Sequence, residues 1–161
     1  MAAAHADRIR SLLAQGPAPA RQLIDLLGVS QPTLSRALAG MGPEIVRIGA
    51  ARSIQYALRD AARGLPEVPV YRVSAAGRIR QLALLVPVRP DGFVMLREDG
   101  ATLYSEGLPW WIQDMRPAGF LGRAFAVGFA AALGLPADIG AWSDAHVLRA
   151  LIRHGDDPVG N

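Results

Sequence analysis

The sequence predicts an α+β fold, in which a mostly helical part is followed by a part built on an antiparallel sheet. Two patterns predict it. Apolar residues recur at helical spacing over 4–38 and after residue 120, whereas they alternate at a period of two over 44–58 and along much of 70–106. Gly and Pro punctuate the segments between these runs. With 161 residues, 51% of them hydrophobic, the chain can bury the core of one domain or of two small ones.

Three helices are expected in the N-terminal third. The first covers 4–14 and the second covers 18–27, where Gly28 stops it. The third follows Ser30, whose side chain is expected to cap it. Pro32 falls in its first turn, where the missing N–H costs nothing.

A two-stranded ribbon follows these helices. The runs EIVRIG (44–49) and SIQYAL (53–58) alternate at a period of two, and Gly49 to Arg52 make the turn between them. The order of helix, helix, turn, helix and ribbon predicts a winged helix-turn-helix domain over 1–63. The segment DAARGLPEVP (60–69) is expected to be a linker.

The second predicted domain covers 64–161 and begins with a sheet. The strand-like runs are VYRVS (70–74), IRQLALLVPV (79–88), FVMLRE (93–98) and ATLYSE (101–106), separated by glycine-containing turns. A loop over 107–119 leads to an apolar helix over 120–133. A last helix over 144–153 is capped by Ser143. This part is expected to be a small antiparallel sheet with helices packed on it.

The basic charge is concentrated in the N-terminal third. Residues 1–63 hold eight Arg against four acidic residues, whereas 64–161 hold nine Arg against ten. A positive helix-turn-helix points to duplex DNA, because the first turn of its second helix faces base edges in the major groove. Gln pairs with adenine and Arg with guanine, while hydroxyls hold phosphate. The predicted DNA-binding residues are Ser30, Gln31, Pro32, Thr33, Ser35 and Arg36 on the helix, and Arg47 and Arg52 on the ribbon. A helix that only packs, or a winged helix that binds protein, is the alternative.

Two absences limit the chemistry. The chain has no Cys, which excludes disulfides and thiolate metal sites, and no Lys, which excludes a phosphate-loop or Schiff-base lysine. The three His residues have no metal-ligand spacing, and Asp156-Asp157 is interpreted as a solvated loop. No metal site is therefore expected. The longest apolar run is too short to span a bilayer, and no secretory signal fits. A cytoplasmic protein with no membrane partner is expected.

The segments LPWWIQDMRPAGFLGRAFA (108–126) and LRALIRHGDDPVGN (148–161) resemble the N-terminal subdomain of the HipA family. The resemblance covers about 70–161, and DMRPAGFLGR is its most specific part. In that family a serine/threonine kinase is the toxin of a toxin–antitoxin system, and some members carry a winged helix-turn-helix ahead of the subdomain. The resemblance implies that the kinase residues lie beyond Asn161. No catalytic residue or cofactor is therefore expected in this chain, and ATP and Mg belong to the downstream core.

The predicted function is the DNA-binding and kinase-docking portion of such a kinase, which binds duplex DNA and regulates its own promoter. The residues expected to dock on the kinase core, in the same polypeptide or a separate chain, are Trp110, Trp111, Phe120 and Arg123. One alternative is a ligand-responsive transcription regulator whose pocket is lined by Trp110 or Trp111. Another is a stand-alone interaction module that restrains a separate kinase. The chain is expected to be a fragment, and a homodimer is left open.

Overall fold

The structure, a computed structural model, describes residues 2–155 and the side chains of 4–51 and 53–155. The chain forms two compact units, 1–106 and 107–161. The domain boundary predicted between 63 and 64 stays a prediction, although the compact units divide the chain at a later point. The segment 156–161, which holds Asp156-Asp157 and the end of the HipA resemblance, lies outside the described residues.

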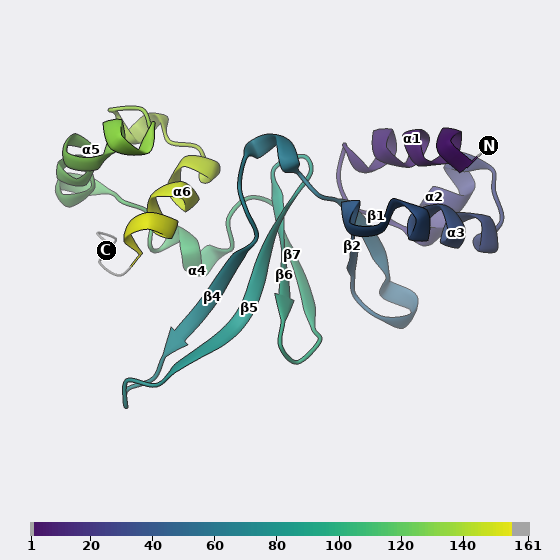
Figure 1. The fold of residues 1–161 in the computed structure, drawn as a ribbon, viewed down its shortest axis with the longest axis horizontal. Coiled ribbons are helices and arrows are strands. Elements are labelled where there is room, and N and C mark those ends of the chain that lie inside the picture. The colour runs from purple at the N-terminus through teal and green to yellow at the C-terminus, as the bar shows by residue number, and fades with distance from the viewer. Residues whose placement is uncertain (1, 156–161) are drawn as a thin grey trace. The chain divides into compact units, whose positions relative to one another are not determined.

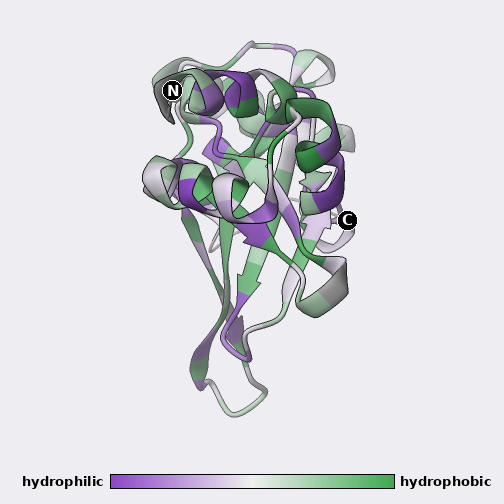
Figure 2. Cartoon of the chain, turned by 90° about the vertical axis from the view of Figure 1, so that its right-hand side faces the viewer, coloured by the Kyte–Doolittle hydropathy of each residue, from purple (hydrophilic) through white to green (hydrophobic). Residues whose placement is uncertain are grey.

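The first unit begins with the three expected helices, α1 (Ala2–Leu13), α2 (Ala20–Leu27) and α3 (Gln31–Met41), drawn in purple and blue in Figure 1. Apolar and polar segments are interspersed along these helices, as Figure 2 shows. One stripe of each helix is buried, which is the pattern that made the helices predictable. The core between them contains Ile9, Leu13, Leu23, Leu27, Leu34, Leu38 and Met41.

The connection between α2 and α3 is short and follows from its residues. Gly28 adopts the left-handed region with φ of 65°, and its N–H donates to the Ile24 carbonyl at 2.9 Å. Ser30 stands in extended conformation at the N-cap of α3, but its side chain accepts no capping hydrogen bond. Its Oγ lies 3.0 Å from Oγ1 of Thr33 instead. The predicted capping role of Ser30 was therefore wrong, because its hydroxyl pairs with that of Thr33 and caps no backbone N–H.

A three-stranded antiparallel sheet completes this part of the unit. Its strands β1 (Ala18–Pro19), β2 (Ile45–Ile48) and β3 (Gln55–Leu58) lie in the order β1-β3-β2. The predicted ribbon is β2 and β3. The short helices η1 (Gly42–Glu44) and η2 (Ala51–Ser53) precede and connect these two strands. Strand β1 was not predicted, because two residues cannot show a periodicity.

A second antiparallel sheet contains the four predicted strands. They are β4 (Val68–Val73), β5 (Ile79–Val88), β6 (Gly92–Arg97) and β7 (Thr102–Ser105), in the order β4-β5-β6-β7. Figure 1 shows the long β4–β5 hairpin extending beyond β6 and β7. The two sheets share one core, in which Val46, Ile48 and Ala57 pack against Val86, Val88 and Val94. This shared core explains why the compact unit runs on to residue 106.

The expected linker is part of this packing. Asp60 is only 5% exposed, and its N–H donates to the Pro87 carbonyl at 3.0 Å. The helix η3 (Ala61–Arg63) follows, and Arg63 donates to the carbonyls of Val88 and Gly92 at 2.8 and 2.7 Å. The prediction of a linker over 60–69 was therefore wrong for 60–63, which pack against the sheet, and for Val68 and Pro69, which begin β4. The buried carboxylate and its arginine hold this segment against β5 and β6.

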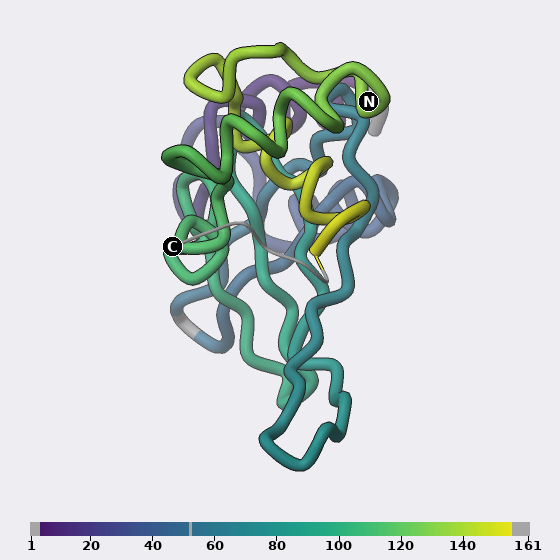
Figure 3. The backbone as a smooth tube through the Cα atoms, turned by 90° about the vertical axis from the view of Figure 1, so that its left-hand side faces the viewer, coloured from purple at the N-terminus to yellow at the C-terminus, as the bar shows by residue number. Residues whose placement is uncertain are grey.

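The second unit is helical. It contains α4 (Trp110–Gln113), α5 (Gly119–Leu133), the short helix η4 (Ile139–Ala141) and α6 (Asp144–His154). The green α5 and the yellow α6 lie beside each other in Figure 3. The ring centroids of Phe125 on α5 and His154 on α6 are 5.5 Å apart. Ser143 caps α6 as predicted, since its Oγ accepts from the His146 N–H at 3.4 Å. The turn α4 falls where only a loop was predicted.

The mixed class predicted from the sequence is confirmed at a coarse level. Residues 2–155 contain six α-helices and two antiparallel sheets. Across that described range, none of the helices has the length and apolar character needed to cross a membrane.

Candidate functional site

The residues predicted to contact DNA gather on one surface of α3. Gln31, Pro32, Ser35 and Arg36 are exposed, as is Ser30 just before the helix, whereas Thr33 is half-buried. Leu34 and Leu38 point the other way, into the core. Helical spacing therefore does bring the polar residues together. We call this surface, made of Ser30, Gln31, Pro32, Thr33, Ser35 and Arg36, the α3 outer face.

Local hydrogen bonds occupy part of the α3 outer face. Nε of Arg36 donates to the Pro32 carbonyl at 3.3 Å, one turn back along the helix. The Ser30 and Thr33 hydroxyls face each other at 3.0 Å.

Arg47 is an exposed residue of β2. Arg52 lies in η2, and its side chain is outside the described part of the structure. The role of these residues in contacting DNA stays a prediction.

The four residues predicted to dock on a kinase core are divided between α4 and α5. Trp110 and Phe120 are 76% and 77% exposed, Arg123 is exposed, and Trp111 is half-buried. The exposed apolar side chains of α5 also include Leu121, Val127 and Phe129. Their presence gives α5 an apolar outer side as well as a buried one, which is why its amphipathic pattern is weak.

The DMRPAGFLGR segment contributes packing contacts to the second unit. Arg116 donates to Asp144 Oδ1 at 2.6 Å and to the Trp142 carbonyl at 3.2 Å. Asp144 Oδ2 also accepts from the Leu108 N–H at 2.9 Å. Gly122 packs so closely that a Cβ there would lie 2.6 Å from the backbone carbon of Pro117. Packing contacts therefore account for Arg116 and Gly122 of this motif, and they involve no ligand.

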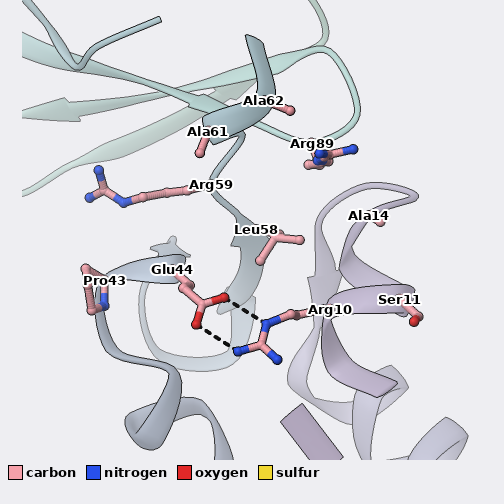
Figure 4. Close-up of a pocket in the computed structure, with 10 residues that line it drawn as sticks. All are labelled: Arg10, Ser11, Ala14, Pro43, Glu44, Leu58, Arg59, Ala61, Ala62 and Arg89. Carbon is pink, nitrogen blue, oxygen red and sulfur yellow. Dashed lines mark hydrogen bonds and ion pairs between the residues drawn. The ribbon is translucent and has the colours of Figure 1, made fainter. Parts of the chain in front are cut away.

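A cleft of about 720 Å³ lies within the first unit, and sequence reasoning did not find it. Its lining holds three arginines, Arg10, Arg59 and Arg89, against one acidic residue, Glu44. Figure 4 shows the Arg10–Glu44 pair on one side of Leu58, and Arg59 and Arg89 on the two flanks of the segment that carries Ala61 and Ala62. We call it the arginine cleft.

The backbone fixes the positions of Arg59 and Arg89. The N–H of Arg89 donates to the Leu58 carbonyl at 2.8 Å, and Arg59 forms an isolated antiparallel bridge with Val88. Two segments thirty residues apart in sequence are thus joined. The only signal that the sequence offered was the placement of Arg59 and Arg89 at the ends of two strand-like runs, which does not indicate that those ends pair.

The cleft contains one ion pair whose pKa values are shifted in opposite directions. Nε and Nη2 of Arg10 each donate to a carboxylate oxygen of Glu44 at 2.8 Å. This hydrogen bonding raises the pKa of Arg10 and lowers the pKa of Glu44. Both groups are therefore charged at neutral pH. Within 2–155, no group of three His, Asp or Glu side chains is placed to hold a metal ion.

Comparison with known proteins shows the family to which the chain belongs. Residues 65–161 match the model of the YjjJ-like toxin middle domain, which covers the four-stranded sheet and the whole second unit. The chain therefore belongs to the YjjJ-like toxin family.

The chain is also 40% identical over 146 residues to Toxin YjjJ of Escherichia coli strain K12. The alignment covers 90% of this chain and 33% of that toxin, so the chain spans about a third of the length of the curated relative it matches. No solved structure matches the chain.

These findings correct two expectations. The 65–161 region matches the YjjJ-like toxin middle domain, and the identification as a HipA N-terminal fragment was wrong. The predicted function as the DNA-binding and kinase-docking portion of a HipA kinase is overturned with it, because neither comparison names DNA or a kinase. The broader expectation of a bacterial toxin-type protein is confirmed.

Proposed function

We propose that this chain supplies the N-terminal and middle parts of a bacterial toxin of the YjjJ type, which arrests growth when it is produced in excess. One observation carries the proposal. The 40% identity to Toxin YjjJ extends over 90% of the chain, so it includes both compact units and is not confined to the middle domain. The cytoplasm stays the predicted compartment.

A chimera tests this proposal. The segment of Toxin YjjJ aligned with this chain is replaced by the chain itself, and growth is followed after induction in Escherichia coli. We expect growth arrest comparable to that caused by the parent toxin. The control chimera carries Leu85→Asp, which puts a charge at a fully buried position of β5 and is expected to be inert. A chimera that is expressed and folded but leaves growth unchanged would contradict the proposal.

The winged helix-turn-helix predicted over 1–63 stays our proposal. The order α1, β1, α2, α3, β2, β3 supports it, as do the three-residue connection between α2 and α3 and the sheet order β1-β3-β2. Duplex DNA stays the predicted partner of the α3 outer face. That prediction concerns the surface alone and not the activity of the toxin.

Salt titration tests this partner. Binding of the chain to a random duplex is measured against salt for the wild type, for Arg36→Ala with Arg47→Ala, and for the control Arg97→Ala on β6. Each lost phosphate contact should lower the slope of log K against log salt by about one. Equal slopes for all three proteins would remove duplex DNA as the partner.

A further inference from the structure

The strands β4 and β5 form an arm that extends beyond the rest of their sheet. Strand β6 pairs with β5 only from Ala83 onward, so the earlier part of β5 pairs with β4 alone. Every residue of 71–80 is exposed, and Figure 1 shows this ribbon reaching past β6 and β7. We call residues 70–82 the arm. A two-stranded hairpin is at best marginally stable in water, so a third strand would stabilise the arm.

One face of the arm is apolar. The strand register places Val73 opposite Ile79, and Tyr71 lies two residues before Val73 on β4. Residues that lie opposite one another, or two apart on one strand, share a face of the sheet. Tyr71, Val73 and Ile79 are 55%, 64% and 71% exposed. Exposed apolar residues that gather on one face, rather than being scattered singly, mark an interaction surface.

The opposite face of the arm is positively charged. Arg72 lies directly opposite Arg80, and like charges at such positions destabilise a strand pair. Arg80 has an exposed ion pair with Glu98 at 3.3 Å. Arg72 and Arg78 form no ion pair with the described residues. The arm itself contains no Asp or Glu, so carboxylates from a partner would offset the repulsion between its arginines.

The outer edge of β4 is open to a further strand. The sheet order is β4-β5-β6-β7, so within 2–155 no strand pairs with the outer side of β4. The other edge of the arm is partly covered, because the Glu98 N–H donates to the Leu82 carbonyl at 3.4 Å. Pro69 has no N–H, which limits an uninterrupted ladder on β4 to 70–73.

We propose that the outer edge of β4 pairs with an extended segment of a partner protein in which apolar and acidic residues alternate. Main-chain hydrogen bonds hold the segment, and its alternate side chains fall on the two faces of the arm. The apolar ones cover Tyr71, Val73 and Ile79. The acidic ones pair with Arg72 and Arg80. Such binding is independent of the toxin activity.

Two other occupants fit the arm less well. A second copy of the arm brings further arginines and no carboxylate, so pairing two β4 edges adds to the repulsion. A nucleic acid neutralises the arginines but leaves the apolar face and the backbone groups of the β4 edge without partners. Only an acidic and apolar strand satisfies the charge, the apolar face and the edge together.

Calorimetric titration of the whole chain with three capped peptides tests the partner chemistry. TVEVEVT alternates apolar and acidic residues, TVQVQVT keeps the alternation without charge, and TVVEEVT keeps the composition without the alternation. We expect TVEVEVT to bind about tenfold more tightly than either control, because only this peptide matches both faces. The proposal is overturned if no peptide binds, or if TVEVEVT binds no better than TVVEEVT.

Matched variants and hydrogen exchange locate the contact. Arg72→Gln should weaken binding of TVEVEVT by about tenfold and leave TVQVQVT unchanged. Arg21→Gln removes an exposed arginine of α2 and should change neither affinity. Exchange of backbone amides should slow within 70–73 when TVEVEVT is bound. Equal binding by Arg72→Gln and the wild type, or protection confined to other segments, would overturn the proposal.

Two further measurements separate the rival occupants. A random DNA duplex should not displace TVEVEVT at physiological salt, and the free chain should sediment without an arm-mediated dimer. Displacement by the duplex that is lost in Arg72→Gln would assign the arm to nucleic acid. A dimer that Val73→Arg dissociates would assign the β4 edge to a second copy. Either result overturns the proposal.

Discussion

Arg10 and Glu44 join α1 to η1 through a two-point ion pair, with Nε and Nη2 of the arginine each 2.8 Å from a carboxylate oxygen. The partners lie 34 residues apart in sequence. Both side chains are partly exposed, at 40% and 45%, so solvent weakens the attraction between them. The pair orients the first helix against the entry to β2 and forms one wall of the arginine cleft.

The stability of the wild type relative to Glu44→Gln should depend on pH. The hydrogen bonds from Arg10 lower the pKa of Glu44 in the folded state below its ordinary value. The stabilisation is therefore present above the unfolded-state pKa, which is about 4.3 for Glu, and is lost as pH falls through the lower folded-state value. Thermal unfolding from neutral to acidic pH should show a difference in Tm that narrows only on the acidic side. A difference that stays constant with pH would contradict this assignment.

Two glycines of α5 should respond in opposite directions to substitution by alanine. A Cβ at Gly122 would lie 2.6 Å from the Pro117 backbone, whereas a Cβ at Gly128 would meet nothing within 4 Å. Gly122→Ala should destabilise the chain by about 1–3 kcal/mol through overpacking. Gly128→Ala should stabilise it by about 0.5–1 kcal/mol, because alanine favours the helix. Urea denaturation compares the two, and equal effects would show that Gly122 is not tightly packed.

Periodicity predicted most of the elements but not their tertiary contacts. The run IRQLALLVPV coincides with β5, and the polar residues of the α3 outer face came together because helical spacing alone places them there. Asp60 shows the limit of this reasoning. It looked like a linker residue, since no local pattern indicates that its carboxylate is buried beside Arg63 and Arg89.

The arginine cleft was unpredictable for the same reason. Arg59 and Arg89 become neighbours only through the bridge between Arg59 and Val88, which joins two different sheets. The family was also misidentified from short segments. DMRPAGFLGR is explained by packing through Arg116 and Gly122, and a motif fixed by packing is weak evidence for one activity over another.

Asp144 should be essential to the packing of the second unit. Its carboxylate accepts from Arg116 at 2.6 Å and from the Leu108 N–H at 2.9 Å. Asp144→Ala leaves both donors without this acceptor and should cost about 1–3 kcal/mol. Asp138→Ala is the control. Among the described residues, the Asp138 side chain accepts only the N–H of Gly140, so its loss should cost about 1 kcal/mol or less. Tryptophan fluorescence in urea reports on the buried Trp142, and equal midpoints for the two variants would contradict the prediction.

Arg63→Lys should destabilise the first unit although the charge is kept. Nη2 of Arg63 donates to the carbonyls of Val88 and Gly92, Nε lies 2.9 Å from Asp60, and the guanidinium stacks over the Phe93 ring at 4.7 Å. A lysine ammonium is a compact point charge and cannot reach all of these groups from one position. We expect a loss of about 1–3 kcal/mol in the free energy of unfolding, since carbonyls in a part-buried site lose their donors.

The control is Arg97→Lys, at a half-exposed ion pair with Asp99, whose free energy of unfolding should stay within about 0.5 kcal/mol of the wild type. Urea unfolding measured by circular dichroism separates these outcomes, and equal midpoints for Arg63→Lys and Arg97→Lys would show that charge alone holds η3 against β5 and β6.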